Sequence, residues 1–101
     1  CLDAHWIYRG AGNTTAVLSD VLEKYIDRVV ELHLRQSQIG IWTEAFGEGD
    51  IDYAAIAAKL KRRNLEPLLV LEQSVEDETA MTMNAVEAHI KSVKYVQELF
   101  G

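Results

Sequence analysis

The sequence contains a single cysteine, a single proline and no long apolar run among its 101 residues. One cysteine, Cys1, excludes an internal disulfide and is typical of a reducing compartment, so we expect a cytoplasmic protein. No apolar run approaches the roughly 20 residues that a helix needs to cross a bilayer, and the first residues show no signal-peptide pattern. We therefore expect no membrane partner.

Positive charge is also scarce, with 10 Lys and Arg against 16 Asp and Glu and a net charge of −6. Binding to a nucleic-acid backbone needs clustered basic side chains, so we expect no nucleic acid as the main partner. The one basic cluster falls in the last turn of a predicted helix, where it complements the helix dipole. It consists of Lys59, Lys61, Arg62 and Arg63.

The most informative stretch is residues 28–35, in which aliphatic and polar side chains alternate with the period of two that is typical of a strand. One face carries aliphatic side chains such as Leu32 and Leu34. The other face carries Glu31, His33 and Arg35. An acid, an imidazole and a guanidinium on one face indicate the wall of a site.

Two further strands are predicted, at residues 1–6 and 68–72. One helix is expected to begin near residue 14 or 15, a second to begin between residues 50 and 52, and a third to run from about residue 77 to residue 100. The intervals between strands fit βαβ crossovers, which need roughly 30 residues each. Residues 7–13 are expected to form a loop, and residues 36–49 a long irregular segment. This alternation predicts an α/β fold with three parallel strands whose carboxyl ends share one edge, where such folds bind ligands.

Three parallel strands alone would leave two long unpaired edges, which proteins avoid. The third predicted strand, at residues 68–72, is apolar on both faces and is expected to be buried on both. Because the chain also opens on Cys1 within a predicted strand, we expect residues 1–101 to be part of a larger α/β domain. The alternative is a half-domain completed by other chains.

Three residues that can bind a divalent metal stand at the ends of the three strands: Asp3, His33 and Glu72. Two carboxylates and one imidazole suit Mn, Mg, Co or Zn and leave coordination positions for substrate oxygens. A metal bound to a carbonyl and an adjacent hydroxyl would ease removal of the proton between them, and a Glu could accept that proton. The pattern predicts metal-assisted chemistry on a carbohydrate.

Other residues near the strand ends are candidates for substrate binding. His5 either holds a substrate hydroxyl or supports the metal ligands, and Arg35 either binds a substrate oxygen or pairs with Glu31. Trp6, Trp42 and Phe46 form either an apolar wall for a sugar or part of the packing at the rim. Cys1 is interpreted as an inert filler, and His89 is assigned no role.

Four segments resemble, in order and spacing, the last three βα units of the sugar phosphate isomerase/epimerase superfamily. These segments are residues 3–6, 31–35, 47–53 and 70–73. The superfamily has a xylose-isomerase-like TIM barrel and includes ketose 3-epimerases, inosose dehydratases and, more distantly, endonuclease IV. The resemblance implies that this chain is the C-terminal part of a (β/α)₈ barrel. It also implies that Asp3, His33 and Glu72 are metal ligands and that Glu72 is catalytic, with a further Glu ligand and acid–base partner upstream of residue 1.

The sequence departs from the superfamily pattern at several positions. Trp6 stands where epimerases often carry a substrate-contacting His, and Arg35-Gln36 replaces a common Lys-Asp pair. Acids at the predicted start of a helix, namely Glu48, Asp50 and Asp52, make an unphosphorylated sugar or cyclitol at least as fitting as a sugar phosphate.

We therefore expect a metal-dependent isomerase or epimerase of a sugar-like substrate, whose protein partner is the rest of the barrel or another copy of the chain. The alternatives are an inosose-type dehydratase and a non-catalytic fragment that binds a partner through its strand edges.

Overall fold

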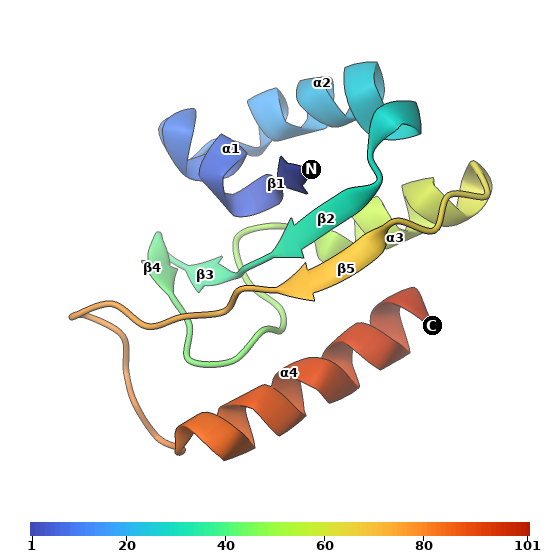
Figure 1. Cartoon of the computed structure of the whole chain (residues 1–101). Coiled ribbons are helices and arrows are strands. Elements are labelled where there is room, and N and C mark those ends of the chain that lie inside the picture. Colours follow the sequence, from blue (N-terminus) through green and yellow to red (C-terminus); the bar gives the residue numbers. More distant parts are fainter.

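Three parallel strands form the centre of the computed structural model, which describes residues 1–101. They are β1 (Leu2–Asp3), β2 (Glu31–Leu34) and β5 (Leu68–Leu71), in the order β1-β2-β5. Figure 1 shows β2 and β5 running side by side between the helices. The predicted α/β class, with its parallel sheet and shared carboxyl edge, is confirmed.

The central strand β2 divides its side chains between two faces as its alternation predicted. Leu32 and Leu34 are buried in the core, whereas Glu31 and His33 lie on the other face and are only partly buried. The register places Asp3 opposite His33, and His33 opposite Val70. The polar side chains of Asp3 and His33 are therefore aligned on neighbouring strands, and β5 places the apolar Val70 beside them.

The first helix, α1 (Ala4–Gly10), corrects two predictions, because the first strand ends at Asp3 and residues 7–10 are not loop. The Asp3 carboxylate accepts a hydrogen bond from the backbone N–H of Trp6 at 3.0 Å. This is the contact of a helix N-cap, which favours a helix from Ala4 onward. His5 and Trp6 consequently follow helical geometry and do not alternate across the sheet.

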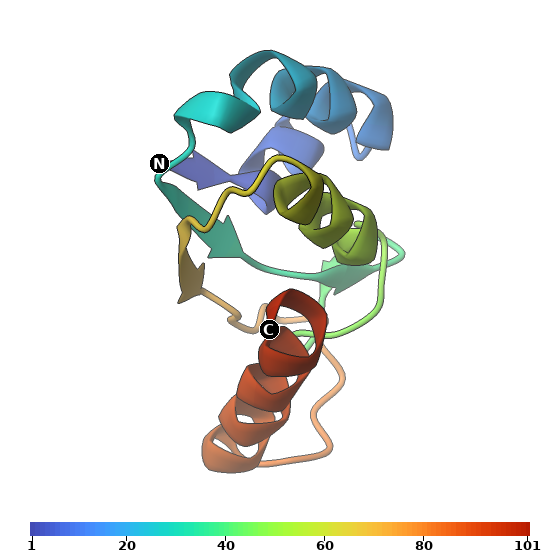
Figure 2. The ribbon, with the colours of Figure 1, turned by 90° about the vertical axis from the view of Figure 1, so that its right-hand side faces the viewer.

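Helices α2 (Thr15–Tyr25) and α3 (Tyr53–Arg62) confirm the two predicted crossover helices. A short 3₁₀ turn, η1 (Ile26–Arg28), leads from α2 to β2. In Figure 2, α2 and α3 lie on the same side of the sheet. The apolar stripe that helical spacing predicts for α3 is buried, at Tyr53, Ile56, Ala57 and Leu60. Of the stripe predicted for α2 and the turn after it, Leu18, Leu22 and Ile26 are buried, Val21 is partly buried, and Tyr25 is 40% exposed.

The basic end of α3 also ties that helix to α2. Lys59 and Arg63 form ion pairs with Glu23, and Arg63 donates to both carboxylate oxygens of Asp27 at 3.2 Å. These exposed pairs join the end of α3 to α2 and η1, so Lys59 and Arg63 have partners within the fold.

The last helix, α4 (Ala85–Phe100), begins eight residues after its predicted start at Asp77. Asn84 caps it by accepting a hydrogen bond from the N–H of Glu87, so the regular helix starts where this side chain can cap it. Its C-terminal half packs on the core, through Tyr95, Val96, Leu99 and Phe100. In its N-terminal half Ala88 and Ser92 are buried, whereas Val86 and Ile90, which helical spacing predicts to share a stripe with Phe100, are exposed.

The segment between β2 and α3 was predicted to be irregular, but it contains an antiparallel pair, β3 (Ser37–Gln38) and β4 (Ile41–Trp42). The buried Gln36 amide fastens the segment by donating to the carbonyls of Gly47 and Ile51 and accepting from the N–H of Ile51. Asp50 accepts from Ser37 Oγ and from the N–H groups of residues 39 and 40. A long connection is thereby closed by buried side-chain hydrogen bonds.

The face of the sheet that bears Glu31 and His33 is open. Leu68 on β5, in register with Glu31, is 64% exposed, and the other residues of β5 are half-buried. The prediction that β5 is buried on both faces is therefore wrong for this chain. None of the helices combines the length and apolar character that crossing a lipid bilayer requires.

A substitution at Gly49 would test how tightly the segment after β2 is packed. A Cβ at this position would lie 2.1 Å from the Ser37 carbonyl oxygen and 2.7 Å from the Gln36 side chain. We expect Gly49→Ala to lower the free energy of unfolding by about 1–3 kcal/mol, because the added Cβ would clash with the Ser37 carbonyl oxygen and force the backbone to shift. Urea denaturation measures the change.

Gly47→Ala is the matched control, since a Cβ at Gly47 would meet no atom within 4 Å. It should unfold at a urea concentration close to that of the wild type. Equal stability of the two variants would contradict the packing described for Gly49.

Candidate metal centre

Asp3, His33 and Glu72 meet at the carboxyl edge of the parallel sheet. One donor atom from each residue lies within 4.8 Å of the other two, and His33 Nδ1 is 3.0 Å from Glu72 Oε1. Asp3 ends β1, His33 lies on β2, and Glu72 follows β5, where its N–H donates to the Leu34 carbonyl at 3.0 Å. The structure brings the three predicted ligands together.

The donor set fits a divalent cation with mixed oxygen and nitrogen ligands. With bonds of about 2.1 Å, two ligand atoms on one cation are at most about 4.2 Å apart, so small side-chain movements suffice to place all three on one ion. Three protein donors leave coordination positions for the oxygens of a substrate. All three residues are partly exposed, so a ligand reaches them from solvent.

Glu31 holds the other nitrogen of the His33 ring. Its Oε1 lies 2.5 Å from His33 Nε2, so the imidazole stands between two carboxylates, Glu31 and Glu72. In many metal sites a carboxylate on the far nitrogen fixes the tautomer and orientation of the histidine ligand. Sequence reasoning assigned Glu31 no such role, although its place two residues before His33 on the same face was the signal for it.

Neighbouring groups raise the pKa values of both His33 and Asp3. Hydrogen bonds to Glu31 first, and then to Glu72, raise the pKa of His33 above its ordinary 6.5. Burial raises the pKa of Asp3 above 3.8, and Glu72 adds to this, while the Trp6 N–H and the Arg35 guanidinium oppose it. Three carboxylates, Asp3, Glu31 and Glu72, thus lie around one imidazole, with the Arg35 guanidinium beside them.

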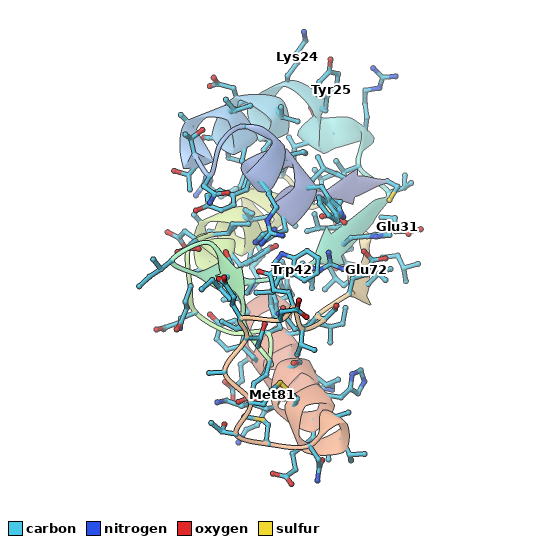
Figure 3. All side chains as sticks on the ribbon, turned by 90° about the vertical axis from the view of Figure 1, so that its left-hand side faces the viewer. Lys24, Tyr25, Glu31, Trp42, Glu72 and Met81 are labelled. Carbon is cyan, nitrogen blue, oxygen red and sulfur yellow. The ribbon has the colours of Figure 1, made fainter.

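Arg35 lies beside the metal ligands and does not pair with Glu31. Its Nε donates to the Glu72 carbonyl at 2.8 Å, and its guanidinium lies 4.1 Å from the centre of the Trp42 ring. Trp6, which is 52% exposed, packs edge-on against Trp42 at 5.8 Å. In Figure 3, Trp42 and Glu72 lie at the same level of the molecule. Arg35, Trp6 and Trp42 therefore form one cluster next to the candidate centre.

His5, predicted to contact substrate, is fully buried in α1. Its ring packs edge-on against Tyr8 at 5.5 Å and Trp42 at 6.2 Å, and neither ring nitrogen has a hydrogen-bond partner. Burial, together with the nearby charges of Arg9 and Arg35, lowers the pKa of His5 to about 4. The structure does not bring this neutral, enclosed imidazole into the Asp3, His33 and Glu72 cluster.

The structure favours the packing alternative for Phe46 and corrects the prediction for Cys1. Phe46 is buried and packs on Tyr53 and Tyr95, so it belongs to the core and not to an exposed apolar wall. Cys1, interpreted as an inert filler, is exposed, and its Sγ lies 3.2 Å from His33 Nε2.

A cavity of about 830 Å³ opens away from the three ligands, between residues 38–48, residues 78–83 and α4. Its lining includes Trp42 but none of Asp3, His33 and Glu72. Trp42 is therefore shared between this cavity and the cluster formed with Trp6 and Arg35.

Two glutamines that sequence reasoning did not single out organise this edge. Gln73 accepts from the N–H of Gln36 at 2.8 Å and donates to the carbonyls of Gln36 and Thr43. These bonds join the end of β5 to the segment after β2.

Comparison with family models, with curated proteins and with solved structures finds no match for this chain.

In the metal-free protein, the two carboxylates beside His33 should raise the titration midpoint of its imidazole. We expect the His33 imidazole, followed by NMR in the presence of a chelator, to titrate above pH 6.5, and Glu31→Gln to move its midpoint downward. Glu66→Gln, an exposed carboxylate outside the cluster, is the control and should leave the midpoint unchanged.

The raised pKa of His33 also makes the free energy of unfolding depend on pH. Because the folded state raises the pKa of His33, the protonated imidazole stabilises the fold below pH 6.5, and this contribution is lost as the pH rises through the folded pKa. The stability difference between wild type and Glu31→Gln should therefore shrink between mildly acidic and alkaline pH. A titration midpoint of His33 at or below pH 6.5 in the wild type would contradict its placement between Glu31 and Glu72.

Proposed function

We propose that this chain forms the metal-binding edge of an isomerase or epimerase that moves a proton next to the carbonyl of a sugar or cyclitol. The observation that carries the proposal is the convergence of Asp3, His33 and Glu72 from three consecutive parallel strands. Each residue alone has ordinary structural explanations. Three donors of suitable chemistry at one edge, with a carboxylate behind the imidazole, favour a metal site.

We further propose that the three βα units are the last three of a TIM barrel. The parallel strand order supports this, and so do the unpaired edges of β1 and β5 and the exposure of Leu68 on the open face. Neighbouring strands would pair with both edges and enclose that face. The resemblance of residues 3–6, 31–35, 47–53 and 70–73 to the sugar phosphate isomerase/epimerase superfamily points the same way.

The residues would divide the work as follows. A cation held by Asp3, His33 and Glu72 would polarise the substrate carbonyl and the adjacent hydroxyl. Glu72 accepts or returns the proton on the carbon between them, and Glu31 keeps the His33 ring oriented. Arg35 is held by the Glu72 carbonyl and by Trp42, so it offers its remaining N–H groups to a substrate oxygen from a fixed position.

The region around the start of α3 supports an unphosphorylated substrate. Asp52 caps the helix by accepting from the Ala55 N–H, and Asp50 binds N–H groups of the preceding segment. The Asp52 carboxylate thus occupies a position that a phosphate group would use at a helix N-terminus, and Asp50 adds negative charge to the preceding segment. Trp6, which is 52% exposed, offers aromatic surface to the apolar face of a sugar ring, whereas the Trp42 ring is occupied by the guanidinium groups of Arg9 and Arg35.

Metal binding is the first test. We expect Mn²⁺ to bind the wild-type chain in calorimetry, and Asp3→Asn or Glu72→Gln to weaken the affinity at least about tenfold, since even partners behind the ligands contribute this much. Asn still caps helices well, so Asp3→Asn removes the charge and retains the cap of α1.

Glu66→Gln removes one negative charge from an exposed position outside the cluster and should bind Mn²⁺ like the wild type. A folded chain without Mn²⁺ affinity would reject the enzymatic proposal and favour a binding module that uses its strand edges.

Turnover is the second test, performed on the protein with its barrel complete. We expect the wild type to exchange deuterium from D₂O into the carbon next to the carbonyl of unphosphorylated ketoses, as proton transfer requires. Glu72→Gln should abolish this exchange while its circular dichroism spectrum remains that of the wild type. Full activity of Glu72→Gln would remove this residue from the mechanism, and release of water without epimer formation would indicate a dehydratase.

A further inference from the structure

A second set of donor atoms lies on the far side of the His33 ring from Glu72. Cys1 Sγ is 3.2 Å from His33 Nε2, Glu31 Oε1 is 2.5 Å from the same nitrogen, and the sulfur and the carboxylate oxygen are 3.9 Å apart. Cys1 is exposed, and Glu31 and His33 are partly buried. In Figure 3, Glu31 lies close to Glu72 on the same side of the molecule.

The chemistry of this second group differs from that of the first because it includes sulfur. Thiolate ligands select soft or borderline cations such as Zn²⁺ and Cd²⁺, whereas carboxylates suit Mn²⁺ and Mg²⁺. Around a tetrahedral zinc ion, ligand atoms lie roughly 3.3–3.7 Å apart, given bonds of about 2.0–2.3 Å. The observed separations of 2.5, 3.2 and 3.9 Å bracket that range, so three side chains already stand near a coordinating arrangement.

We propose that Cys1, Glu31 and His33 Nε2 form a second, thiophilic cation site that competes with the Asp3 centre for the His33 ring. A neutral imidazole has one nitrogen lone pair available to a metal, and its other nitrogen carries a proton. A cation on Nδ1 requires an Nε2–H that donates to Glu31. A cation on Nε2 requires an Nδ1–H that donates to Glu72.

Only one of the two sites is therefore complete at a time. When the thiophilic cation binds, the Cys1 thiol releases its proton to solvent as the metal–sulfur bond forms, and no electron transfer is involved. His33 then ceases to be a ligand for the Asp3 centre, and Glu72 accepts a hydrogen bond from it. A soft cation such as Cd²⁺ at the Cys1 site thus weakens the binding of a hard cation such as Mn²⁺ at the Asp3 centre. This antagonism, unlike the second site itself, rests on the proposed metal centre.

Cadmium titration of the full chain tests the site directly. We expect the ultraviolet charge-transfer absorption of a cadmium–thiolate bond in the wild type and in Asp3→Asn, and its loss in Cys1→Ser. Glu31→Gln should weaken cadmium binding. Absence of the band in the wild type, or its loss in Asp3→Asn, would overturn a site separate from the Asp3 centre.

Competition tests the shared imidazole. At a Cd²⁺ concentration ten times its dissociation constant, the apparent Mn²⁺ affinity of the wild type should fall about elevenfold, as mutually exclusive binding requires. The fall should be smaller in Cys1→Ser at the same Cd²⁺ concentration, and equal antagonism in both proteins would overturn the competition.

The two proposals fail in different ways. If the wild type bound no Mn²⁺, the proposed function would be rejected, while the cadmium band of Asp3→Asn would still decide the second site. If Mn²⁺ bound but no cadmium–thiolate band appeared, the second site would be rejected and the proposed function retained.

Discussion

The pairing register of β2 with its two neighbours is the constraint on which the candidate site depends. Leu2 pairs with Leu32 and Asp3 with His33, while Leu34 pairs with Leu71 immediately before Glu72. A slip of one residue would send the polar side chains of β2 into the core. Leu32 and Leu34, both buried, oppose such a slip, so hydrophobic burial on one face determines which donors meet on the other.

The features that follow from periodicity could be predicted from the sequence. Alternation along residues 28–35 placed His33 on a polar face, and strand–helix alternation placed Asp3 and Glu72 at the same edge. The apolar stripes of α2 and α3 also follow helical spacing closely enough to be recognised. Each of these signals depends on residues near one another in the chain or on the general handedness of βαβ units.

Features that depend on a choice between two local interactions could not be predicted. Asp3 suits a strand end as well as a helix cap, and only the bond to the Trp6 N–H decides for the cap. The burial of His5 follows from that choice, because a helix turns it toward Tyr8 and Trp42. The closeness of Cys1 to His33 depends on side-chain rotamers. The amide network of Gln36 and Gln73 joins segments whose closeness no local pattern records.

The Asp3 carboxylate serves a helix as well as the candidate centre, and this has a thermodynamic consequence. Its Oδ1 accepts from the Trp6 N–H, so the side chain is restrained before any ion arrives and loses little rotational freedom on coordination. If the proposed cation binds Asp3 with this cap retained, reciprocity would require it to reinforce the first turn of α1. That turn carries Trp6, whose indole rests against Trp42. The aromatic pair is thereby linked, through one carboxylate, to the occupancy of the sheet edge.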